Sequence, residues 1–251
     1  KTYETQATQY NRVSLIRKFG TYLDSIGVKT YILPKKYYSE GNQYTPYIYT
    51  KAELAKFFAE IDNDKRPCRY ACPYRRQAMP VIFRMFYMCG LRLSEVKLLK
   101  VADVDLEHGI LTINESKNDN SRLVPMPDSL TERCRDFSKE VHLLSGEEDY
   151  YFPTFEGKPM KRGNFYENFR RFLWKAGISH RGRGQGPRIY DFRHTYAVHC
   201  LKKWAEQDKD LMAYLPILKT YMGHYSFRET AYYLRMTADV FPHIALKLET
   251  H

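Results

Sequence analysis

Five polar side chains in this 251-residue chain could together carry out chemistry at a phosphodiester. They are two arginines, a lysine, a histidine and a tyrosine, namely Arg92, Lys117, Arg193, His224 and Tyr233. Cutting a strand by transesterification needs a nucleophile, cations that neutralise the non-bridging oxygens, and an acid for the leaving oxygen. Arginine forks bind phosphate oxygens in pairs, and lysine or histidine donates protons. Tyrosine would be the nucleophile, and the phosphotyrosine would store the bond energy, so that rejoining needs neither ATP nor a metal.

The composition favours a partner that carries negative charge. Forty lysines and arginines against 29 acidic residues give a formal net charge of +11 and a pI near 9.3. For such a basic protein, nucleic acid is the first candidate. Because the chain has 22 tyrosines and 40 basic residues, no member of the set is specific by itself. A hydrophobic content of 43% favours a globular fold.

Cysteines and apolar runs set further limits. The five cysteines are odd in number, and only Cys68 and Cys72 are close, with no second Cys or His pair to complete a zinc set. We interpret them as reduced thiols of a cytoplasmic protein that needs no metal and no cofactor. No apolar run approaches the length of a membrane span, and no signal peptide opens the chain. Since the first residue is Lys1 rather than Met, we expect the natural protein to begin earlier.

An amphipathic helix is predicted near the N-terminus, over residues 11–27. Its apolar residues share one face: Ile16, Phe19, Leu23 and Ile26. Because a lone helix must bury such a stripe, we assign residues 1–33 to the last helix of a truncated preceding domain. Residues 34–49 have no period and predict a linker. Its Lys35 and Lys36 either contact DNA phosphates or are simply solvated.

A second domain, residues 50–251, is predicted to begin at the capping-box pattern Thr50-Lys-Ala-Glu53. After the first helix of this domain comes a segment with four arginines, residues 62–78, which we interpret as a basic loop. Arg75 and Arg76 in it are candidate DNA contacts.

Arg92 lies in the turn between two predicted helices. The apolar residues 79–90 predict a core helix that ends at Gly90, and Ser94 would cap the short helix that follows. A charged residue at such a junction either faces an anion or pairs with Glu95. The residues alone leave both readings open.

A β-hairpin is predicted from two alternating segments, residues 109–116 and 121–127, with Lys117 at its tip. A lysine there is either a reaching cation or an ordinary exposed turn residue. Further helices are expected over residues 128–145 and 168–178, and between them a loop with a short strand over residues 147–165.

Residues 179–188 interleave glycine and proline with arginine and predict a cationic surface loop. Its Arg181, Arg183 and Arg188 are candidate phosphate contacts, with a solvated loop as the alternative.

The last part of the chain is predicted to be helical from Asp191 onward. Arg193 falls in the first turn of that helix, where the helix dipole also favours an anion. His194 and His199 show no partner pattern and are interpreted as structural. A polar stretch at 205–210 interrupts the helices.

A second capping-box pattern, Ser226-Phe-Arg-Glu229, predicts that a helix begins at Phe227, which puts Tyr233 two turns into it.

Four motifs, in this order, are similar to those of the tyrosine recombinases, or phage integrases. They read MCGLRLSEVKLLKVADVDLE, NESKNDNSRLVPMP, YDFRHTYAVHCL and MGHYSFRETAYYL. The similarity runs over roughly residues 46–251, and the first helix resembles the end of the family's DNA-clamping N-terminal domain. The resemblance implies an α+β, mainly helical catalytic fold with a small antiparallel sheet.

The resemblance also implies a role for each of the five residues. Arg92 and Arg193 would clamp the scissile phosphate, and Lys117 would be the general acid. His224 would hydrogen-bond the phosphate, and Tyr233 would form a 3′-phosphotyrosyl link to DNA.

By family resemblance the partners would be double-stranded DNA with a specific recombination site and other copies of the chain. A monomer or dimer in solution would assemble into a homo-tetramer on synapsed DNA, where residues 239–251 dock onto a neighbour. Accessory DNA-bending or directionality factors are further candidates. The implied setting is the cytoplasm of a bacterium, with an origin in a phage or another mobile element that the enzyme integrates or excises.

Two features depart from the family pattern, and one residue competes for a role in it. The motif around Arg193 usually reads His-x-x-Arg, whereas this chain has Tyr190 at the first position, a poor base because the reference pKa of tyrosine is ~10. The interval from Arg193 to His224 is also longer than usual. Tyr232 competes with Tyr233 as nucleophile, and the family spacing of nine residues after the histidine selects Tyr233.

Two other functions fit part of the evidence. A type IB topoisomerase would use the same chemistry, although the motifs match integrases in wording and spacing. A DNA-binding regulatory protein that has lost cleavage would account for Tyr190, but not for the two arginines, the lysine and Tyr233.

Overall fold

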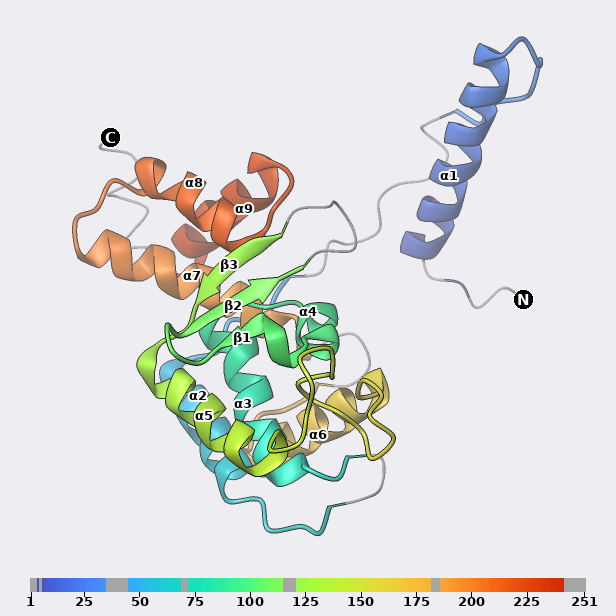
Figure 1. Cartoon of the computed structure of the whole chain (residues 1–251). Helices are drawn as coiled ribbons and strands as arrows, with labels where there is room; N and C mark the ends of the chain where they lie inside the picture. The colour runs from blue at the N-terminus through green and yellow to red at the C-terminus, as the bar shows by residue number, and fades with distance from the viewer. Residues whose placement is uncertain are drawn as a thin grey trace. The chain divides into compact units, whose positions relative to one another are not determined.

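The computed structural model describes residue 4 and residues 6–34, 45–68, 72–114, 121–181 and 186–241. The chain divides into two compact units, residues 1–45 and residues 46–251, and each is described here by itself (Figure 1).

The first unit contains helix α1, Gln6–Ser25. The predicted helix is therefore present, but it begins and ends earlier than residues 11–27. Gly27 follows it with a φ of +85°, a left-handed conformation that glycine adopts without strain. The apolar side chains of Leu15, Ile16 and Phe19 are exposed. Whether this helix belongs to a larger preceding domain stays a prediction.

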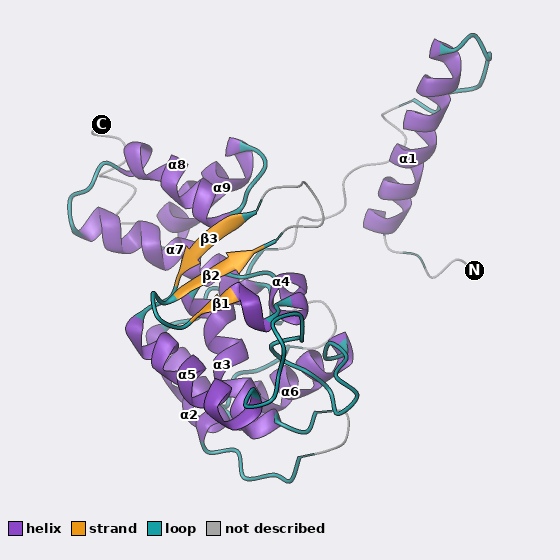
Figure 2. Ribbon diagram, in the orientation of Figure 1, coloured by secondary structure: helices purple, strands orange, loops and turns teal. Residues whose placement is uncertain are grey.

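The second unit is built mainly of helices (Figure 2). They are α2 Lys51–Asp62, α3 Arg75–Met88, α4 Leu93–Leu98, α5 Asp128–Val141, α6 Arg162–Lys175, α7 Asp191–Glu206, α8 Leu211–Met222 and α9 Phe227–Val240. The capping box predicted for α2 is confirmed, because the Glu53 amide donates to Thr50 Oγ1 and the Thr50 amide donates to Glu53 Oε2. The polar stretch near 205–210 contains the turn between α7 and α8.

One small antiparallel sheet accompanies the helices. Its order is β1 Val104–Asp105, β2 Ile110–Ile113 and β3 Arg122–Pro125. In the β2–β3 pair, Leu111 lies opposite Val124 and Ile113 lies opposite Arg122. The predicted hairpin is thus present, and β1 was not predicted. The tip that carries Lys117, residues 115–120, lies outside the described residues.

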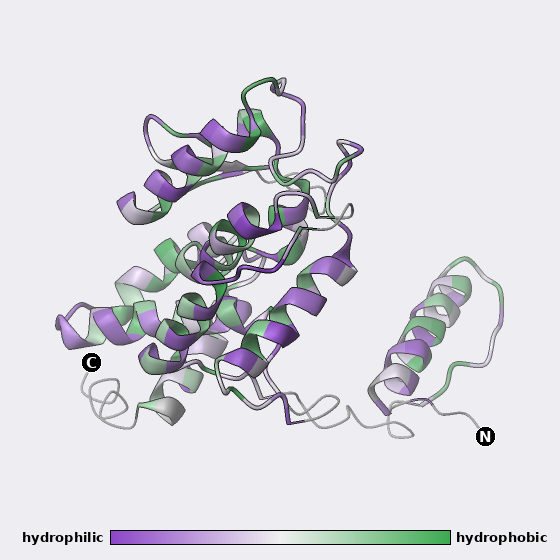
Figure 3. Cartoon of the chain, turned by 90° about the horizontal axis from the view of Figure 1, so that it is seen from below, coloured by the Kyte–Doolittle hydropathy of each residue, from purple (hydrophilic) through white to green (hydrophobic). Residues whose placement is uncertain are grey.

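The apolar side chains form two clusters, and α7 contributes to both. Phe57 on α2 lies at the centre of the larger cluster, with its ring against Phe83 of α3 and Phe192 at the start of α7. The smaller cluster joins the later part of α7, including Leu201, to α8 and α9. Figure 3 shows helices with one hydrophobic and one hydrophilic side, as such packing requires. Because α7 spans both clusters, its first turn is held where they meet.

Several predicted boundaries were wrong. Arg162–Phe165 belong to α6 rather than to a loop, and α5 ends at Val141. Ser94 does not cap α4, because Arg92 is the residue that precedes its first turn. Ser226 does precede α9, but its side chain makes no capping hydrogen bond.

No helix within the described ranges is both long and apolar enough to cross a membrane.

Candidate active site

Three consecutive backbone carbonyl groups at the end of α8 each accept a hydrogen bond from a different arginine. The pairs are Arg122 Nε to Tyr221 O at 2.9 Å, Arg193 Nη2 to Met222 O, and Arg92 Nη2 to Gly223 O at 2.6 Å. The last carbonyls of a helix have no partner within the helix and carry partial negative charge, which cations stabilise. We call Arg92, Arg122 and Arg193 the site arginines. They come from the start of α4, β3 and the first turn of α7, and together they hold the turn that leads to His224.

Arg193 is the most deeply buried of the three, with 1% of its surface exposed. Its Nη1 atom donates to Gly90 O at 2.6 Å, and its Nε atom has no hydrogen-bond partner among the described residues. No carboxylate in the described part of the chain forms an ion pair with it. Burial lowers the pKa of Arg193, yet a guanidinium stays protonated in proteins. A buried cation held only by neutral carbonyls is the arrangement expected where an anion is to be bound.

Arg92 pairs with Glu95, so one of the two readings left open by the sequence is realised. Arg92 Nη1 lies 2.9 Å from Glu95 Oε1, and the Arg92 amide donates to Glu95 Oε2 at 2.7 Å. Arg122 Nη2 also donates to Glu95 Oε2, at 3.0 Å. Burial acts to raise the pKa of Glu95, but the hydrogen bond and charge of Arg122 outweigh it and lower the pKa. Glu95 is therefore a carboxylate shared by two arginines.

Tyr233 lies between two histidine rings. Its ring stacks on His224, with centroids 5.8 Å apart and planes inclined by 14°, and it contacts His194 at 5.5 Å. His194 in turn meets the Tyr190 ring edge-on at 4.9 Å. Tyr233 is buried, with 3% of its surface exposed. Tyr232 packs against Tyr233 on the same helix, with ring centroids 5.9 Å apart.

The pKa values of the two central groups are shifted in ways that decide their protonation. Burial is the main cause that lowers the pKa of His224 to about 3, and Arg193, Arg92 and Arg122 lower it further. At neutral pH the ring is therefore uncharged. His224 Nδ1 and Thr230 Oγ1 share a hydrogen bond of 2.9 Å. Burial raises the pKa of Tyr233, and the charge of Arg193 opposes that effect, so the phenol is protonated.

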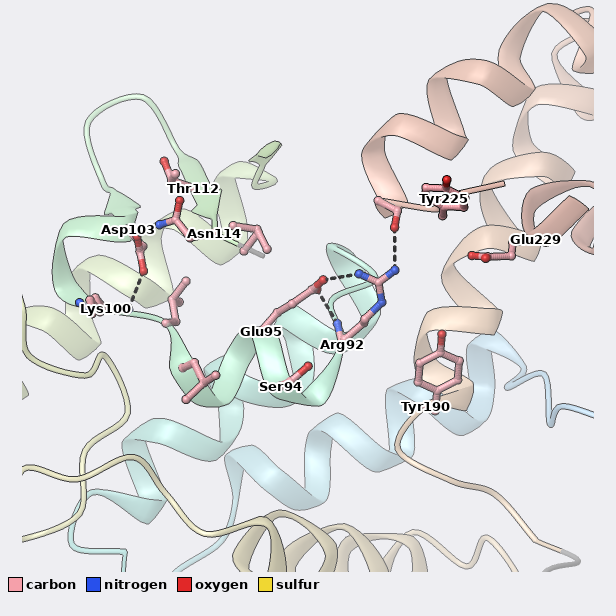
Figure 4. A pocket seen from close by; sticks show the side chains of 14 residues that line it. Arg92, Ser94, Glu95, Lys100, Asp103, Thr112, Asn114, Tyr190, Tyr225 and Glu229 are labelled. Atoms are coloured by element: carbon pink, nitrogen blue, oxygen red, sulfur yellow. Dashed lines mark hydrogen bonds and ion pairs between the residues drawn. The ribbon is translucent and has the colours of Figure 1, made fainter. Parts of the chain in front are cut away.

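A pocket of about 530 Å³ opens beside this group (Figure 4). Arg92, Glu95 and Tyr190 line it together with Tyr225 and Glu229, which flank the start of α9. In Figure 4 the Arg92 guanidinium lies beside Glu95, and the ring of Tyr190 stands apart from Arg92. Of the site arginines, Arg92 lines this pocket directly.

The structure brings four of the predicted catalytic residues together: Arg92, Arg193, His224 and Tyr233. Tyr190 lies at the rim, 44% exposed. Lys117 lies outside the described residues, although both strands of its hairpin are present and β3 reaches the end of α8.

One of the predicted DNA contacts is contradicted. Arg75 is buried, and its guanidinium bonds to Asp64 and to the carbonyl of Arg66. Arg171 binds the same carboxylate, with Nη2 2.6 Å from Asp64 Oδ2. We call Asp64, Arg66, Arg75 and Arg171 the Asp64 cluster. The prediction for Arg75 was wrong because its acidic partner, Asp64, lies eleven positions earlier and was not recognised. Without that partner, a run of basic residues resembles a solvated loop.

The other predicted DNA contacts were not contradicted. Arg76 and Arg188 are exposed, and Arg181 lies over the Tyr47 ring. Lys35, Lys36 and Arg183 lie outside the described residues.

Two residues of the site were missed. Arg122 shares one face of β3 with the buried Val124, whereas Leu123 points outward with 63% exposure. An arginine on the inward face of a strand was the available signal. His194 was interpreted as structural, and the signal was its position four residues after Tyr190, on the same helical face.

No group of three or more metal-binding side chains occurs among the described residues. Cys72 is buried and lies 3.8 Å from the Met160 sulfur, which suits a packed thiol.

Residues 48–239 match the phage integrase family. The chain belongs to that family. The relative y4rB of Sinorhizobium fredii (strain NBRC 101917 / NGR234), named as an integrase/recombinase, is 30% identical over 243 residues, which cover 95% of this chain and 77% of y4rB. Tyrosine recombinase XerD of Proteus mirabilis is 26% identical over 63% of this chain and 47% of its own length.

The fold has a solved counterpart. The XerH site-specific recombinase, in a post-cleavage complex with its palindromic difH substrate, superposes with a TM-score of 0.71 at 21% identity, over 98% of this chain and 68% of XerH. The predicted fold class, a mainly helical tyrosine-recombinase fold with a small antiparallel sheet, is confirmed, and so is the prediction of a recombinase enzyme at the level of the family.

Proposed function

We propose that this chain cleaves and rejoins DNA at a specific site through a covalent link between Tyr233 and a 3′ phosphate. The observation that carries the proposal is the position of Tyr233, which stacks on His224 within the same site as the deeply buried Arg193. A nucleophile next to a cation without a carboxylate partner suits attack on a phosphodiester.

In the cleavage step Tyr233 Oη attacks the phosphorus, its phenol proton passes to solvent water, and the bond to the 5′ oxygen breaks. Arg92 and Arg193 neutralise the charge that develops on the non-bridging oxygens. The leaving 5′ oxygen takes a proton from the general acid, the role of Lys117. A 5′ hydroxyl then attacks the phosphotyrosine in the reverse direction, which reseals the strand and frees the phenol.

His224 acts as a neutral hydrogen-bond donor. When the Thr230 hydroxyl donates to Nδ1, the ring proton resides on Nε2 and can be given to a phosphate oxygen. A neutral ring is consistent with the lowered pKa of His224.

Tyr190 takes the place of the family's usual histidine. Its hydroxyl can hydrogen-bond a phosphate oxygen, and its position at the pocket rim suits that role. Because a phenol is a poor base near neutral pH, we expect this enzyme to cleave slowly relative to members that keep the histidine.

The proposed organisation follows the sequence. Residues 1–33 would end a DNA-clamping domain, residues 34–49 would link it, and residues 50–251 would form the catalytic domain. Double-stranded DNA would be bound by monomers or dimers that assemble into a tetramer when two sites synapse, for integration or excision of a mobile element.

The test uses nicked suicide duplexes built from the DNA that flanks the gene. On such a duplex the cleaved end diffuses away, so a covalent protein–DNA adduct accumulates and is seen on a denaturing gel. We expect an adduct with the wild-type chain and with Tyr232→Phe, and none with Tyr233→Phe.

The other outcomes are equally informative. An adduct that persists in Tyr233→Phe and disappears in Tyr232→Phe would move the nucleophile by one residue. A chain that shifts the duplex in a native gel without forming any adduct would be the DNA-binding regulatory protein instead.

A further inference from the structure

We infer that Arg122 is a positioning residue of the active site, which holds the turn before His224 and orients Glu95 against Arg92. This rests on the proposed function, because the site it would position is the one assigned to DNA cleavage. Arg122 lies in the motif NESKNDNSRLVPMP, but neither the motif nor the resemblance gave it a role.

The contacts of Arg122 join three segments that are distant in the chain. From β3, its Nε atom donates to Tyr221 O at the end of α8, at 2.9 Å. Its Nη2 atom donates to Glu95 Oε2 on α4, at 3.0 Å. Only 7% of the Arg122 side chain and 5% of the Glu95 side chain are exposed. A single guanidinium therefore ties the hairpin strand to both sides of the site.

The fit around Arg122 is close. A Cβ atom placed on Gly223 would lie 2.8 Å from Arg122 Nη1, so the guanidinium occupies the space beside that residue's backbone. Gly223 has a φ of +61° and directly precedes His224. The Arg122 guanidinium therefore packs against the backbone of Gly223 and helps to set the position of the His224 backbone that follows.

Loss of Arg122 would act through its neighbours. Among the described residues, Glu95 would keep its contacts with Arg92, and the Tyr221 carbonyl would lose the donor that Arg122 provides. The turn before His224 would then be held by Arg92 at Gly223 O and by Arg193 at Met222 O, without the third arginine. Because sub-ångström errors in a catalytic group cost rate rather than affinity, cleavage should suffer more than DNA binding.

The experiment measures single-turnover cleavage of the suicide duplex, the Kd for the same duplex, and the Tm. The variants are Arg122→Ala, Arg122→Lys, Arg92→Ala and the double variant Arg92→Ala/Arg122→Ala. The matched control is Arg84→Ala. Arg84 is also a buried arginine, and it lies on the α2–α3 side of the larger apolar cluster. Its Nη1 and Nη2 atoms bind the two carboxylate oxygens of Asp62, at 2.8 and 2.7 Å.

We expect Arg122→Ala to slow cleavage by about 10²-fold with little change in Kd. Arg122→Lys keeps the positive charge and should recover part of the rate. The recovery should be incomplete, because one ammonium cannot make both bonds of the guanidinium in the same geometry. In the double variant the two losses should be less than additive, since Arg92 and Arg122 act on one carboxylate and one turn.

A second readout does not depend on cleavage. In protein labelled with ¹⁵N-histidine, the His224 ring resonances, assigned with His224→Asn, should shift in Arg122→Ala and stay unchanged in Arg84→Ala. If the wild-type chain forms no adduct, the proposed function fails, and this spectrum still decides the role of Arg122.

The inference is overturned by any of three results: wild-type cleavage in Arg122→Ala, a loss of cleavage no larger than that in Arg84→Ala at equal loss of Tm, or unchanged His224 resonances.

Discussion

Helix α3 connects two groups of arginines that contain the same kinds of residue and differ in what the arginines bind. Its first residue, Arg75, belongs to the Asp64 cluster, and its last turn leads to Gly90 and Arg92 in the site. A helix of this length spans about 21 Å, so the two groups are well separated. Each combines three arginines with one carboxylate, Asp64 in one and Glu95 in the other.

What differs is the acceptor that each arginine has. In the Asp64 cluster the guanidinium groups converge on the carboxylate, and Arg75 and Arg171 both bind Asp64 Oδ2. In the site, the hydrogen bonds of Arg193 within the described residues go to the neutral carbonyls of Gly90 and Met222. Arginine and phosphate form charge-assisted and frequently bidentate pairs, which are among the strong hydrogen bonds in proteins. A phosphate can therefore compete for Arg193, whereas Arg75 already has its anion.

The largest effect that separates the two groups is expected from Arg193→Ala. Removal of one preorganised donor to a transition-state oxyanion costs about 10²–10³-fold in rate, and we expect a loss of at least that size in adduct formation. The measurement is single-turnover cleavage per folded molecule, with the folded fraction determined by circular dichroism. Arg193→Lys keeps the positive charge but loses the planar guanidinium. Its cleavage rate should lie between those of the wild type and Arg193→Ala. Cleavage within a few-fold of wild type in Arg193→Ala would contradict the assignment of Arg193 to the phosphate.

Asp64→Ala should give the opposite pattern, a loss of stability with little loss of chemistry. Removal of one partner of a buried ion pair leaves an uncompensated charge and typically costs about 3–5 kcal/mol. Urea unfolding would measure the cost, and the fraction that remains folded should cleave at the wild-type rate. A variant of normal stability would contradict the predicted role of Asp64 in the cluster. A variant that is fully folded and inactive would show that the two ends of α3 are not independent.

The same cluster sets a dependence on acid. Burial acts to raise the pKa of Asp64, but Arg171 and Arg75 outweigh it and lower the pKa to about 2 from its ordinary value of 3.8. A depressed folded-state pKa contributes stability above the unfolded value, and that stability is lost as the pH falls from about 4 through about 2. The free energy of unfolding should fall less steeply over this window in Asp64→Asn than in the wild type.

Gly90→Ala should have a moderate effect on both stability and cleavage. Gly90 has a φ of +59°, and an added Cβ would lie 2.7 Å from the Tyr196 ring. The left-handed conformation alone costs a non-glycine residue about 1–2 kcal/mol. Since the Gly90 carbonyl accepts from Arg193 Nη1, any shift of the backbone also moves the guanidinium. Thermal unfolding and single-turnover cleavage should decline together, and a loss of stability alone would mean that Arg193 tolerates the shift.

The two groups also show what the sequence can and cannot predict. Arg92, Arg193, His224 and Tyr233 could be predicted because their motifs are familiar and occur in the family's order, and the helices could be predicted from their apolar periods. Arg75 was misassigned because composition alone does not reveal that Asp64 neutralises it. Arg122 was missed because its acceptor, the Tyr221 carbonyl, lies 99 residues away. Every residue has a backbone carbonyl, so the sequence does not show which one accepts a hydrogen bond.

The smallest predicted effect compares two exposed arginines, one near each group. Arg188 directly precedes the turn into α7, whose first turn holds Arg193, whereas Arg76 lies in the first turn of α3 next to the Asp64 cluster. If DNA crosses the pocket lined by Arg92 and Tyr190, Arg188 is placed to contact a phosphate. Arg76 lies at the opposite end of α3 from Arg92 and should not contact that DNA.

Loss of one phosphate contact weakens binding to all sequences alike and lowers the slope of log K against log salt by about 1. We therefore expect Arg188→Ala to reduce that slope by about this amount and Arg76→Ala to leave it unchanged. Fluorescence anisotropy with a short duplex at several salt concentrations measures both. Equal changes in the two variants would mean that DNA also covers the α3 end of the domain, and the contrast between the two arginine groups would then concern catalysis alone.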